Sequence, residues 1–494
     1  MTSATLGAGA RETDGRPATV ARAVRSAAGR RLPLAATLAA LLAGMAGMEA
    51  MLSGRVSATS VAGALAAAIV VGLSAWRPEI GCWLLAAAIP LTVGLERNAV
   101  VPVLRPSEAI TVLVAAGVLV HDLPTRRRGR YSGLDIAVLA YVAAGVIVPS
   151  LVLYADRTSL DLATLRTVIS PLQYLVIYLV FSRARLSPSA VRVTLALALA
   201  VSALVAVVGV AQLADVPGVR SFLAANYPLS GTDNSICQYG VCRPTSVLSH
   251  WSSFGAYSVL GYTLALGLSA TRYHRLPRGW LAAVMIVDAV AVFASGTQAA
   301  VAGLVLGTVV VAVCARRVPR QVVLVGVALA AAVALLWPQI SPRVEQQLGG
   351  QGVQTPESLA VRETYWSQLF LPVLEPHLLV GTGTVIPPQV PPKRAAFVDN
   401  EYLVMAFRAG VIGLAALLLM YASVAALGWR NRAAADPEVR AVATAAVAYV
   451  AALAVMGMTA EYLTYGGVAQ SFWMLVALLA ASRLTPTGVA EVPR

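Results

Sequence analysis

The sequence predicts an all-α fold class: a polytopic membrane helix bundle of about 12–14 spans with one large extracytoplasmic loop that contains surface helices. Three observations predict this class. The chain has 494 residues, of which 58% are hydrophobic and only 12% are charged, whereas soluble globular proteins carry roughly 25% charged residues. Apolar runs of bilayer-spanning length recur along most of the chain. Short clusters of arginine lie between these runs.

The apolar runs give fourteen candidate spans. Two of them, 79–96 and 107–121, are short, and Pro90 interrupts the first, so re-entrant segments are an alternative there. The candidate spans are 32–52, 58–76, 79–96, 107–121, 133–154, 164–182, 189–213, 246–270, 279–296, 298–314, 320–338, 401–428, 438–460 and 467–484.

The arginine clusters predict the orientation of these spans. With a cytoplasmic N-terminus, every cluster falls in a cytoplasmic loop, where positive charge is normally retained. The same placement accounts for the net charge of +14, so we expect no nucleic-acid partner. The clusters are Arg126, Arg127, Arg128 and Arg130; Arg183 and Arg185; Arg272, Arg275 and Arg278; Arg316, Arg317 and Arg320; and Arg430 and Arg432.

The predicted organisation is one membrane domain between two cytoplasmic tails, in the cytoplasmic (inner) membrane. Residues 1–31 are polar and rich in arginine, which predicts a disordered N-terminal tail and no cleavable signal peptide. The membrane domain spans 32–484, and 485–494 form the C-terminal tail.

Two long loops, 214–245 and 339–400, fall on the extracytoplasmic side in this orientation, with the short turns at 295–298 and 461–467. Long loops in compact proteins usually have a function or are disordered. Apolar residues at helical spacing over about 357–375 predict an amphipathic surface helix. The proline-rich run 387–392 cannot be helical. We therefore expect the chemistry at this face.

The four cysteines divide between the two environments. Cys237 and Cys242 lie in an extracytoplasmic loop, where oxidation is permitted, and we predict a disulfide between them. Cys82 and Cys314 lie in apolar spans and are expected to be buried. A zinc site needs further ligands, and only His250 is near in sequence, so no metal is predicted.

Three segments at the outer edge combine ionisable and polar residues. They are Arg243–Trp251, Arg362–Trp366, and Asp399–Leu403 followed by Arg408. Ionisable groups at the membrane are costly unless they face a cavity or a partner. Arginines kept where the positive-inside rule depletes them favour an anionic ligand such as a phosphate.

Each segment also has an ordinary structural interpretation. The first could be a snorkelling arginine with capping hydroxyls, and the second a charge pair on a surface helix. A helix cap alone would explain Asp399 and Asn400, but it does not explain a buried Arg408.

In this order, the segments resemble the O-antigen ligase and Wzy-type polymerase family of membrane glycosyltransferases. That family has an arginine-led segment entering a mid-chain span, a Thr-Gly-Ser-Arg-Gly-like turn, and a long outer loop with Arg and Trp. A Pro-Leu-Leu-Gly-X-Gly stretch and a helix with His or Asp, Asn, an aromatic residue and Gly-Ile-Ile-Gly follow. The counterparts here are Arg243–Trp251, Ser295–Ala299, Arg362–Trp366, Pro376–Gly383 and Asp399–Gly413. The resemblance covers roughly 160–430.

The resemblance implies a GT-C-like fold and a glycosyltransferase that takes glycan from a polyprenyl diphosphate-linked donor. The glycan would be transferred to, or polymerised on, a sugar hydroxyl at the outer face, without metal or cofactor. The partners would be the lipid-linked glycan, a glycan acceptor, the lipid bilayer and other polysaccharide-assembly proteins.

The resemblance also implies roles for particular residues. Arg243, Arg362 and Arg408 would bind the diphosphate, and Asp399 and Glu401 would be catalytic. The residues expected to bind substrate are Asn400, Tyr402, His250, Trp366 and Gln298.

Two positions depart from the family pattern. Gln298 stands where the turn often has arginine, and Asp399 stands where the ligase branch has histidine. Both polymerisation and ligation therefore stay open. The alternative function is a multi-span transporter or a lipid-linked-glycan flippase, although the internal repeats typical of transporters are not visible. A structural scaffold is a third interpretation.

Overall fold

The computed structural model describes ten stretches of the chain, and several predicted features fall elsewhere. The described residues are 58–96, 104–122, 132–157, 161–227, 237–238, 241–316, 320–338, 341, 357–383 and 398–481. The features outside them are the candidate span 32–52, both terminal tails, the arginines at 126–130, Arg317 and the proline-rich run 387–392.

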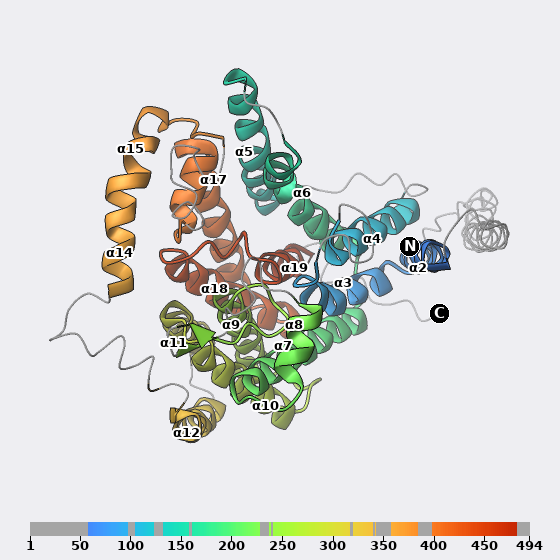
Figure 1. Ribbon diagram of the computed structural model, residues 1–494. Helices are drawn as coiled ribbons and strands as arrows, with labels where there is room; N and C mark the ends of the chain where they lie inside the picture. The colour runs from blue at the N-terminus through green and yellow to red at the C-terminus, as the bar shows by residue number, and fades with distance from the viewer. Residues whose placement is uncertain are drawn as a thin grey trace, which may run out of the picture.

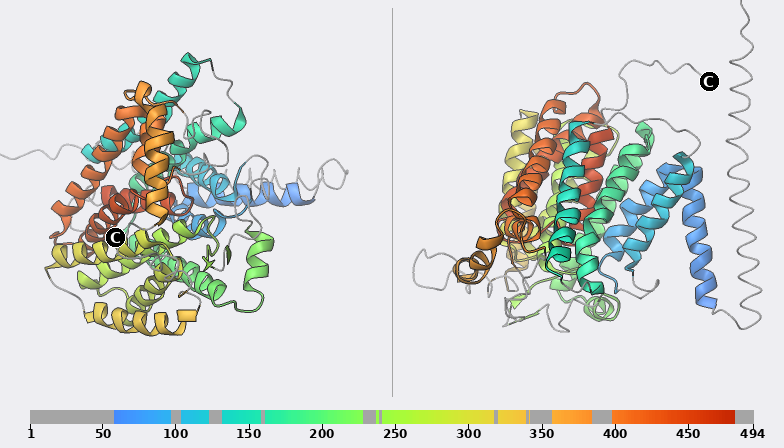
Figure 2. Two further views of the ribbon diagram at one scale, coloured as in Figure 1. Left: turned by 60° about the vertical axis from the view of Figure 1, so that its left-hand side comes forward. Right: turned by 90° about the horizontal axis from the view of Figure 1, so that it is seen from above.

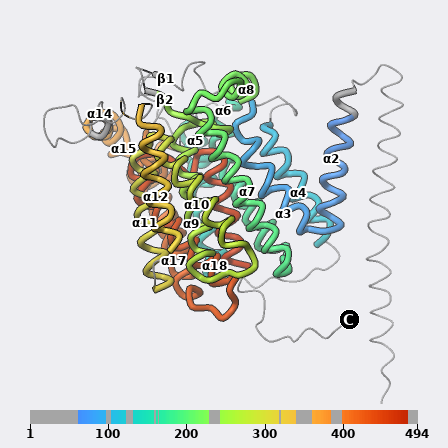
Figure 3. The backbone as a smooth tube through the Cα atoms, turned by 90° about the horizontal axis from the view of Figure 1, so that it is seen from below, coloured from blue at the N-terminus to red at the C-terminus, as the bar shows by residue number. Residues whose placement is uncertain are grey.

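Long helices packed side by side form the described part of the chain (Figures 1 and 3). Each candidate span from 58–76 onward coincides with one of them, so the predicted all-α fold class is confirmed. The helices are α2 (Ala58–Trp76), α3 (Pro78–Thr92), α4 (Pro106–Asp122), α5 (Gly133–Ala155), α6 (Leu162–Arg183), α7 (Pro188–Leu213), α9 (Trp251–Ala270), α10 (Arg278–Ala294), α11 (Gln298–Ala315), α12 (Arg320–Leu335), α17 (Glu401–Asn431), α18 (Pro437–Met456) and α19 (Val468–Ala481).

Six of the described helices are long and apolar enough to cross a membrane: α5, α6, α7, α11, α17 and α18. Shorter apolar helices are α3, α12, α19 and the Ala62–Trp76 part of α2. These helices support a polytopic membrane protein. The number of described helices that meet both the length and the hydropathy criterion is smaller than the predicted number of spans. One reason is that α4 and α10 have 17 residues each.

The centre of the bundle is formed by α9, α18 and α19. Nearly every residue of α9 is buried, including serines and tyrosines as well as apolar side chains. α9 packs against α10, α11 and α18. Because α9 is surrounded by other helices, its polar residues need not contact lipid.

α17 is interrupted at Ala409 and Gly410, and the 378–382 segment fills the break. Gly410 has φ +60° and ψ −153°, outside the helical region. The Thr382 backbone N–H donates to Phe407 O at 2.7 Å, and the Val411 N–H donates to Leu378 O at 2.8 Å. The backbone groups freed by the break are thus paired with the neighbouring segment, as buried backbone requires.

Glycine is required on both sides of this contact. A Cβ atom on Gly410 would lie 2.3 Å from the Leu379 carbonyl, and one on Gly381 would lie 2.4 Å from Phe407 O. Both glycines also have positive φ. The two glycine-containing motifs noted in the sequence therefore pack against each other.

The predicted amphipathic helix is present. It comprises α14 (Glu357–Tyr365), a π-helical turn (Trp366–Phe370), α15 (Leu371–Leu374) and a 3₁₀ turn (Glu375–His377). Figure 3 shows α14 nearly end-on while the bundle helices run along the page, so α14 lies across the bundle direction. Phe370 and Leu374 pack with Val398, Val404 and Phe407. This small apolar cluster fixes the surface helix to the start of α17.

Candidate functional site

The three predicted segments meet at one end of the bundle, which we call the site end. There α7 ends, α9 and α17 begin, and the 457–467 turn joins α18 to α19. The Glu401 N–H donates to Gly457 O at 2.8 Å, and the rings of His250 and Tyr465 stack at 5.2 Å. In Figure 3 and the right-hand view of Figure 2, α8 (Val219–Asn226, green) and α14 (orange) lie at this same end.

The segment led by Arg243 is irregular and does not open the helix as predicted. α9 begins only at Trp251. The Gln212 side chain at the end of α7 accepts from the backbone N–H groups of Thr245, at 2.9 Å, and Ser246, at 2.8 Å. Ser246 has φ +54°, and its hydroxyl donates to Val205 O. The segment is therefore a loop docked onto α7.

Arg243 lies among aromatic rings. Its guanidinium carbon is 5.0 Å from the centroid of the Trp251 ring, which is a cation–π distance. The His250 ring lies 4.0 Å from the Trp251 ring, and Nδ1 of His250 accepts from the Ser252 N–H, so His250 caps α9. Burial, and then the nearby Arg243 charge, lower the pKa of His250 to about 4. A neutral His250 follows at physiological pH.

The 295–298 turn, predicted on the outer face, lies beside Arg243. A Cβ built on Gly296, which has φ +63°, would be 3.8 Å from Arg243 Cγ. Gln298, at the first position of α11, is exposed. This short distance shows that the turn lies on the same side of the site as Arg243.

The cysteine pattern fits the predicted disulfide. β1 (Cys237–Gln238) and β2 (Val241–Cys242) form a two-stranded antiparallel pair in which Cys237 is aligned with Cys242. Cys242 is disulfide-bonded, and Cys82 and Cys314 are free, buried thiols. Arg243 therefore follows directly after the last residue of β2.

Arg362 and Asp399 form an ion pair at the site end. Arg362 Nε lies 3.0 Å from Asp399 Oδ2, and the two side chains are 30% and 28% exposed. Asp399 has φ +51°, an unfavourable backbone conformation for a residue with a Cβ, and such strain concentrates at functional sites. Both side chains are therefore partly accessible from outside the protein.

The predicted substrate-binding residues next to Asp399 are used by the fold. The Asn400 side chain accepts from the N–H groups of Tyr402 and Leu403 and so caps α17. The Tyr402 hydroxyl donates to Ala454 O at 2.6 Å. The indole N–H of Trp366 likewise donates to a backbone oxygen, that of Val398, at 2.8 Å. These contacts argue for a supporting role.

Glu401, predicted as catalytic, is also held by the fold. The residue is buried, and its carboxylate accepts from the Leu463 N–H at 2.8 Å. Together with the Glu401 N–H bond to Gly457 O, this ties the start of α17 to the 457–467 turn. A carboxylate occupied in this way is poorly placed to contact substrate.

Arg408, predicted to bind the diphosphate, instead binds backbone carbonyls within the bundle. Its guanidinium donates to Gly145 O at 2.7 Å, to Val168 O at 2.8 Å and, through a short hydrogen bond, to Thr167 O. The residue is 5% exposed. These contacts argue against a diphosphate contact.

The partners of Arg408 explain why it is there. Pro149 lies four residues after Gly145 in α5, and Pro171 lies four residues after Thr167 in α6. Proline has no N–H, so each removes the helical donor to the carbonyl four residues earlier. Arg408 supplies donors to both of these carbonyls.

Glu461 is a further site-end residue that sequence reasoning left out of the predicted site. It lies in the 457–467 turn and is 8% exposed. Burial, and then the charges of Glu401 and Asp399, raise its pKa to about 8. The only signal in the sequence was a carboxyl residue in a short turn on the predicted outer face.

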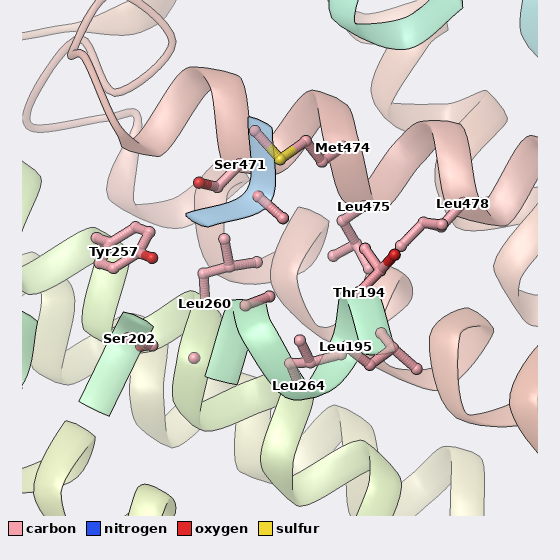
Figure 4. Close-up of a pocket in the computed structure, with 13 residues that line it drawn as sticks. Thr194, Leu195, Ser202, Tyr257, Leu260, Leu264, Ser471, Met474, Leu475 and Leu478 are labelled. Atoms are coloured by element: carbon pink, nitrogen blue, oxygen red, sulfur yellow. The ribbon is translucent and has the colours of Figure 1, made fainter. Parts of the chain in front are cut away.

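A small cavity lies elsewhere, among α3, α7, α9 and α19 (Figure 4). Its lining is largely apolar and includes five leucines, with Ser202 and Tyr257 toward one side. Ser202 donates to the buried carboxylate of Asp288 at 2.9 Å. None of the predicted site residues lines this cavity, so we do not place the chemistry there.

No cluster of three or more His, Cys, Asp or Glu residues able to hold a metal ion occurs among the residues that the structure describes. This observation does not test whether the reaction needs a metal. The expected metal independence stays a prediction.

The segment that holds most of these motifs is similar to a known protein family. Residues 281–418 match the O-antigen ligase family. The match supports an assignment to the O-antigen ligase and Wzy-type polymerase family, as the motifs predicted, and hence a membrane enzyme that handles glycans. It includes Arg362, Asp399 and the 295–298 turn, whereas Arg243 and Glu461 lie outside the matched O-antigen ligase segment. No curated protein matches the chain.

Proposed function

We propose that the protein is a glycosyltransferase of the O-antigen ligase and polymerase type, using a polyprenyl diphosphate-linked glycan as donor and a sugar hydroxyl as acceptor. Cleavage of the donor leaves negative charge on the lipid diphosphate, which arginine neutralises well. A carboxylate of the site takes the proton of the attacking hydroxyl. Neither step requires a metal or a cofactor.

The observation that carries this proposal is the meeting of two arginines from distant segments at one end of the bundle. Arg243 acts on His250, which stacks on Tyr465. Tyr465 contacts Tyr462 edge-on at 5.9 Å, and the Arg362 charge acts on Tyr462. The same aromatic residues thus lie near both arginines, which supports the proposal that the diphosphate and the attached sugar bind at this end.

We also propose that the site end faces outward from the cytoplasmic membrane, with both termini in the cytoplasm. The arginines at 272–278 and 430–432 all lie at the opposite end, after α9 and α17. Cytoplasmic retention of positive charge therefore favours a site on the outer face.

Cysteine labelling tests this orientation. Ala225 in α8 and Ala435 between α17 and α18 are exposed at opposite ends, and the native free thiols are buried, so background labelling is low. We expect a membrane-impermeant maleimide to label Ala225→Cys in spheroplasts and Ala435→Cys only after permeabilisation. The reverse pattern would contradict the proposed orientation.

Turnover of a lipid-linked glycan tests the proposed function. Purified protein in nanodiscs is incubated with a polyprenyl diphosphate-linked oligosaccharide and acceptor, and released polyprenyl diphosphate is measured. We expect wild-type turnover and at least a roughly tenfold loss in an Arg362→Ala, Asp399→Ala double variant. Removing a half-exposed ion pair costs at most about 1 kcal/mol of stability, so the fold should persist.

The matched control is the ion pair between Arg220 and Asp215, at 3.1 Å, which also lies at the site end. We expect its double alanine variant to keep wild-type turnover. If wild-type protein in proteoliposomes moves the lipid-linked glycan across the bilayer without cleaving it, the transferase is excluded and the flippase is favoured.

A further inference from the structure

Glu461 is fixed in position by the start of α17. Two bonds join Glu401 to the 457–467 turn, as described above, and the Asn400 side chain donates to Met458 O at 3.3 Å. The Glu461 carbonyl accepts from the N–H and the hydroxyl of Thr464, at 3.0 and 2.7 Å. The backbone on both sides of Glu461 is therefore held in place.

The Glu461 side chain, in contrast, is not used by the fold. Within the stretches that the structure describes, no hydrogen bond or ion pair reaches its carboxylate. The nearby Tyr465 hydroxyl, in a residue only 9% exposed, also has no hydrogen-bond partner among these residues. Burial, and then the Glu461 charge, raise the pKa of the Tyr465 hydroxyl.

Buried polar groups without partners are destabilising, by about 1–3 kcal/mol each, and a catalytic role or a bound ligand is one explanation for them. A carboxylate beside a hydroxyl, with aromatic rings around them, suits a sugar: the carboxylate accepts from a sugar hydroxyl and the rings pack on the sugar face. The stacked rings of His250 and Tyr465 provide such a surface.

The two carboxylates whose charges act on Glu461 are already engaged. Asp399 is paired with Arg362, and Glu401 accepts from Leu463. Of these three neighbouring carboxylates, Glu461 is thus the one best able to receive a proton from substrate.

We propose that Glu461 is the catalytic base that accepts the proton of the acceptor hydroxyl, a role that rests on the proposed transferase function. The acceptor oxygen forms a bond to the anomeric carbon of the donor, while the bond from that carbon to the phosphate oxygen breaks. The electron pair of the broken bond stays on the lipid diphosphate, and the hydroxyl proton moves to the Glu461 carboxylate.

The surroundings of Glu461 set its protonation. The α17 start presents Asp399 and Glu401, the turn presents Tyr462 and Tyr465, and Arg362 faces Tyr462 from α14. His250, on Tyr465, is neutral at physiological pH because its pKa is about 4. The pKa of Glu461 is about 8. Below that pH the carboxyl holds a proton and cannot accept another.

The pH dependence of turnover tests Glu461. We expect kcat/KM of the wild type to rise by about tenfold per pH unit between pH 6 and the pKa of about 8, and then to level off. Glu461→Gln should reduce kcat by roughly 10²–10⁴-fold and remove the rise. Asp399→Asn should keep the rise, because it leaves the base in place.

Glu438→Gln is the matched control, because Glu438 is a buried glutamate at the opposite end of α18, paired there with Arg275. We expect its pH profile to equal that of the wild type. An active Glu461→Gln variant that retains the pH rise would overturn the role of Glu461 and leave the transferase standing. A wild-type protein that never releases lipid diphosphate would overturn the proposed function itself, and Glu461 with it.

Discussion

An Arg408→Ala variant is expected to lose on the order of 3–5 kcal/mol of stability, since it leaves buried backbone carbonyls without donors. The carbonyls of Gly145 and Thr167 have no helical donors, because proline follows each of them by four residues. Apolar surroundings make unpaired carbonyls more costly than they are in contact with water. The loss is measured as a lower midpoint of thermal or denaturant unfolding of the purified protein in detergent.

Restoring the helical donors should rescue this variant. A Pro149→Ala, Pro171→Ala protein regains both N–H groups, so adding Arg408→Ala to it should cost much less than in the wild-type background. This double-mutant comparison separates hydrogen bonding from lost packing. Equal costs in both backgrounds would show that Arg408 does not act through the two proline-freed carbonyls.

Arg440→Ala provides the control for removing an arginine bound to backbone oxygens. Its side chain donates to Ala434 O and Thr271 O but is only half-buried. Water can replace those bonds, so we expect a change below about 1 kcal/mol.

The sequence predicted the helices of this protein because span length and hydropathy are local properties. The surface helix was also predictable, since Tyr365, Trp366 and Phe370 repeat at helical spacing. The role of Arg408 was not predictable in the same way. Its carbonyl partners lie 240–263 residues away, and only the folded bundle brings them together. In the sequence, Arg408 had no identifiable partner, and we therefore interpreted it as part of a ligand-binding site.

In the candidate site, too, local sequence features were predictable and contacts between distant residues were not. The segments of Arg243, Arg362 and Asp399 were predicted, because each combines charge with a position at the predicted outer edge. The sequence could not rank the carboxyl groups. Glu401 begins α17 and Glu461 lies in the turn after α18, and only the Leu463 hydrogen bond shows that Glu401 is engaged by the fold.

Arg243→Ala is expected to reduce kcat/KM for the lipid-linked donor by roughly 10²–10³-fold, the usual effect of removing one group that stabilises developing negative charge. Arg243→Lys should be intermediate, because lysine keeps the charge but loses the planar pair of donors. The measurement is release of polyprenyl diphosphate, together with inhibition by added polyprenyl diphosphate, which should weaken in both variants.

The midpoint of unfolding distinguishes a role of Arg243 in donor binding from a purely structural role. Arg243 lies 5.0 Å from the Trp251 ring centroid, and Arg77 lies at the same distance from the Trp76 ring, at the opposite end of the bundle. Loss of either cation–π contact costs about 0.5–1 kcal/mol, so this contact by itself should shift the unfolding midpoint only slightly in either alanine variant. Only Arg243→Ala should lose turnover. Equal turnover in the two variants would contradict a diphosphate contact at Arg243, whereas a selective loss would identify this arginine, outside the matched family segment, as part of the donor site.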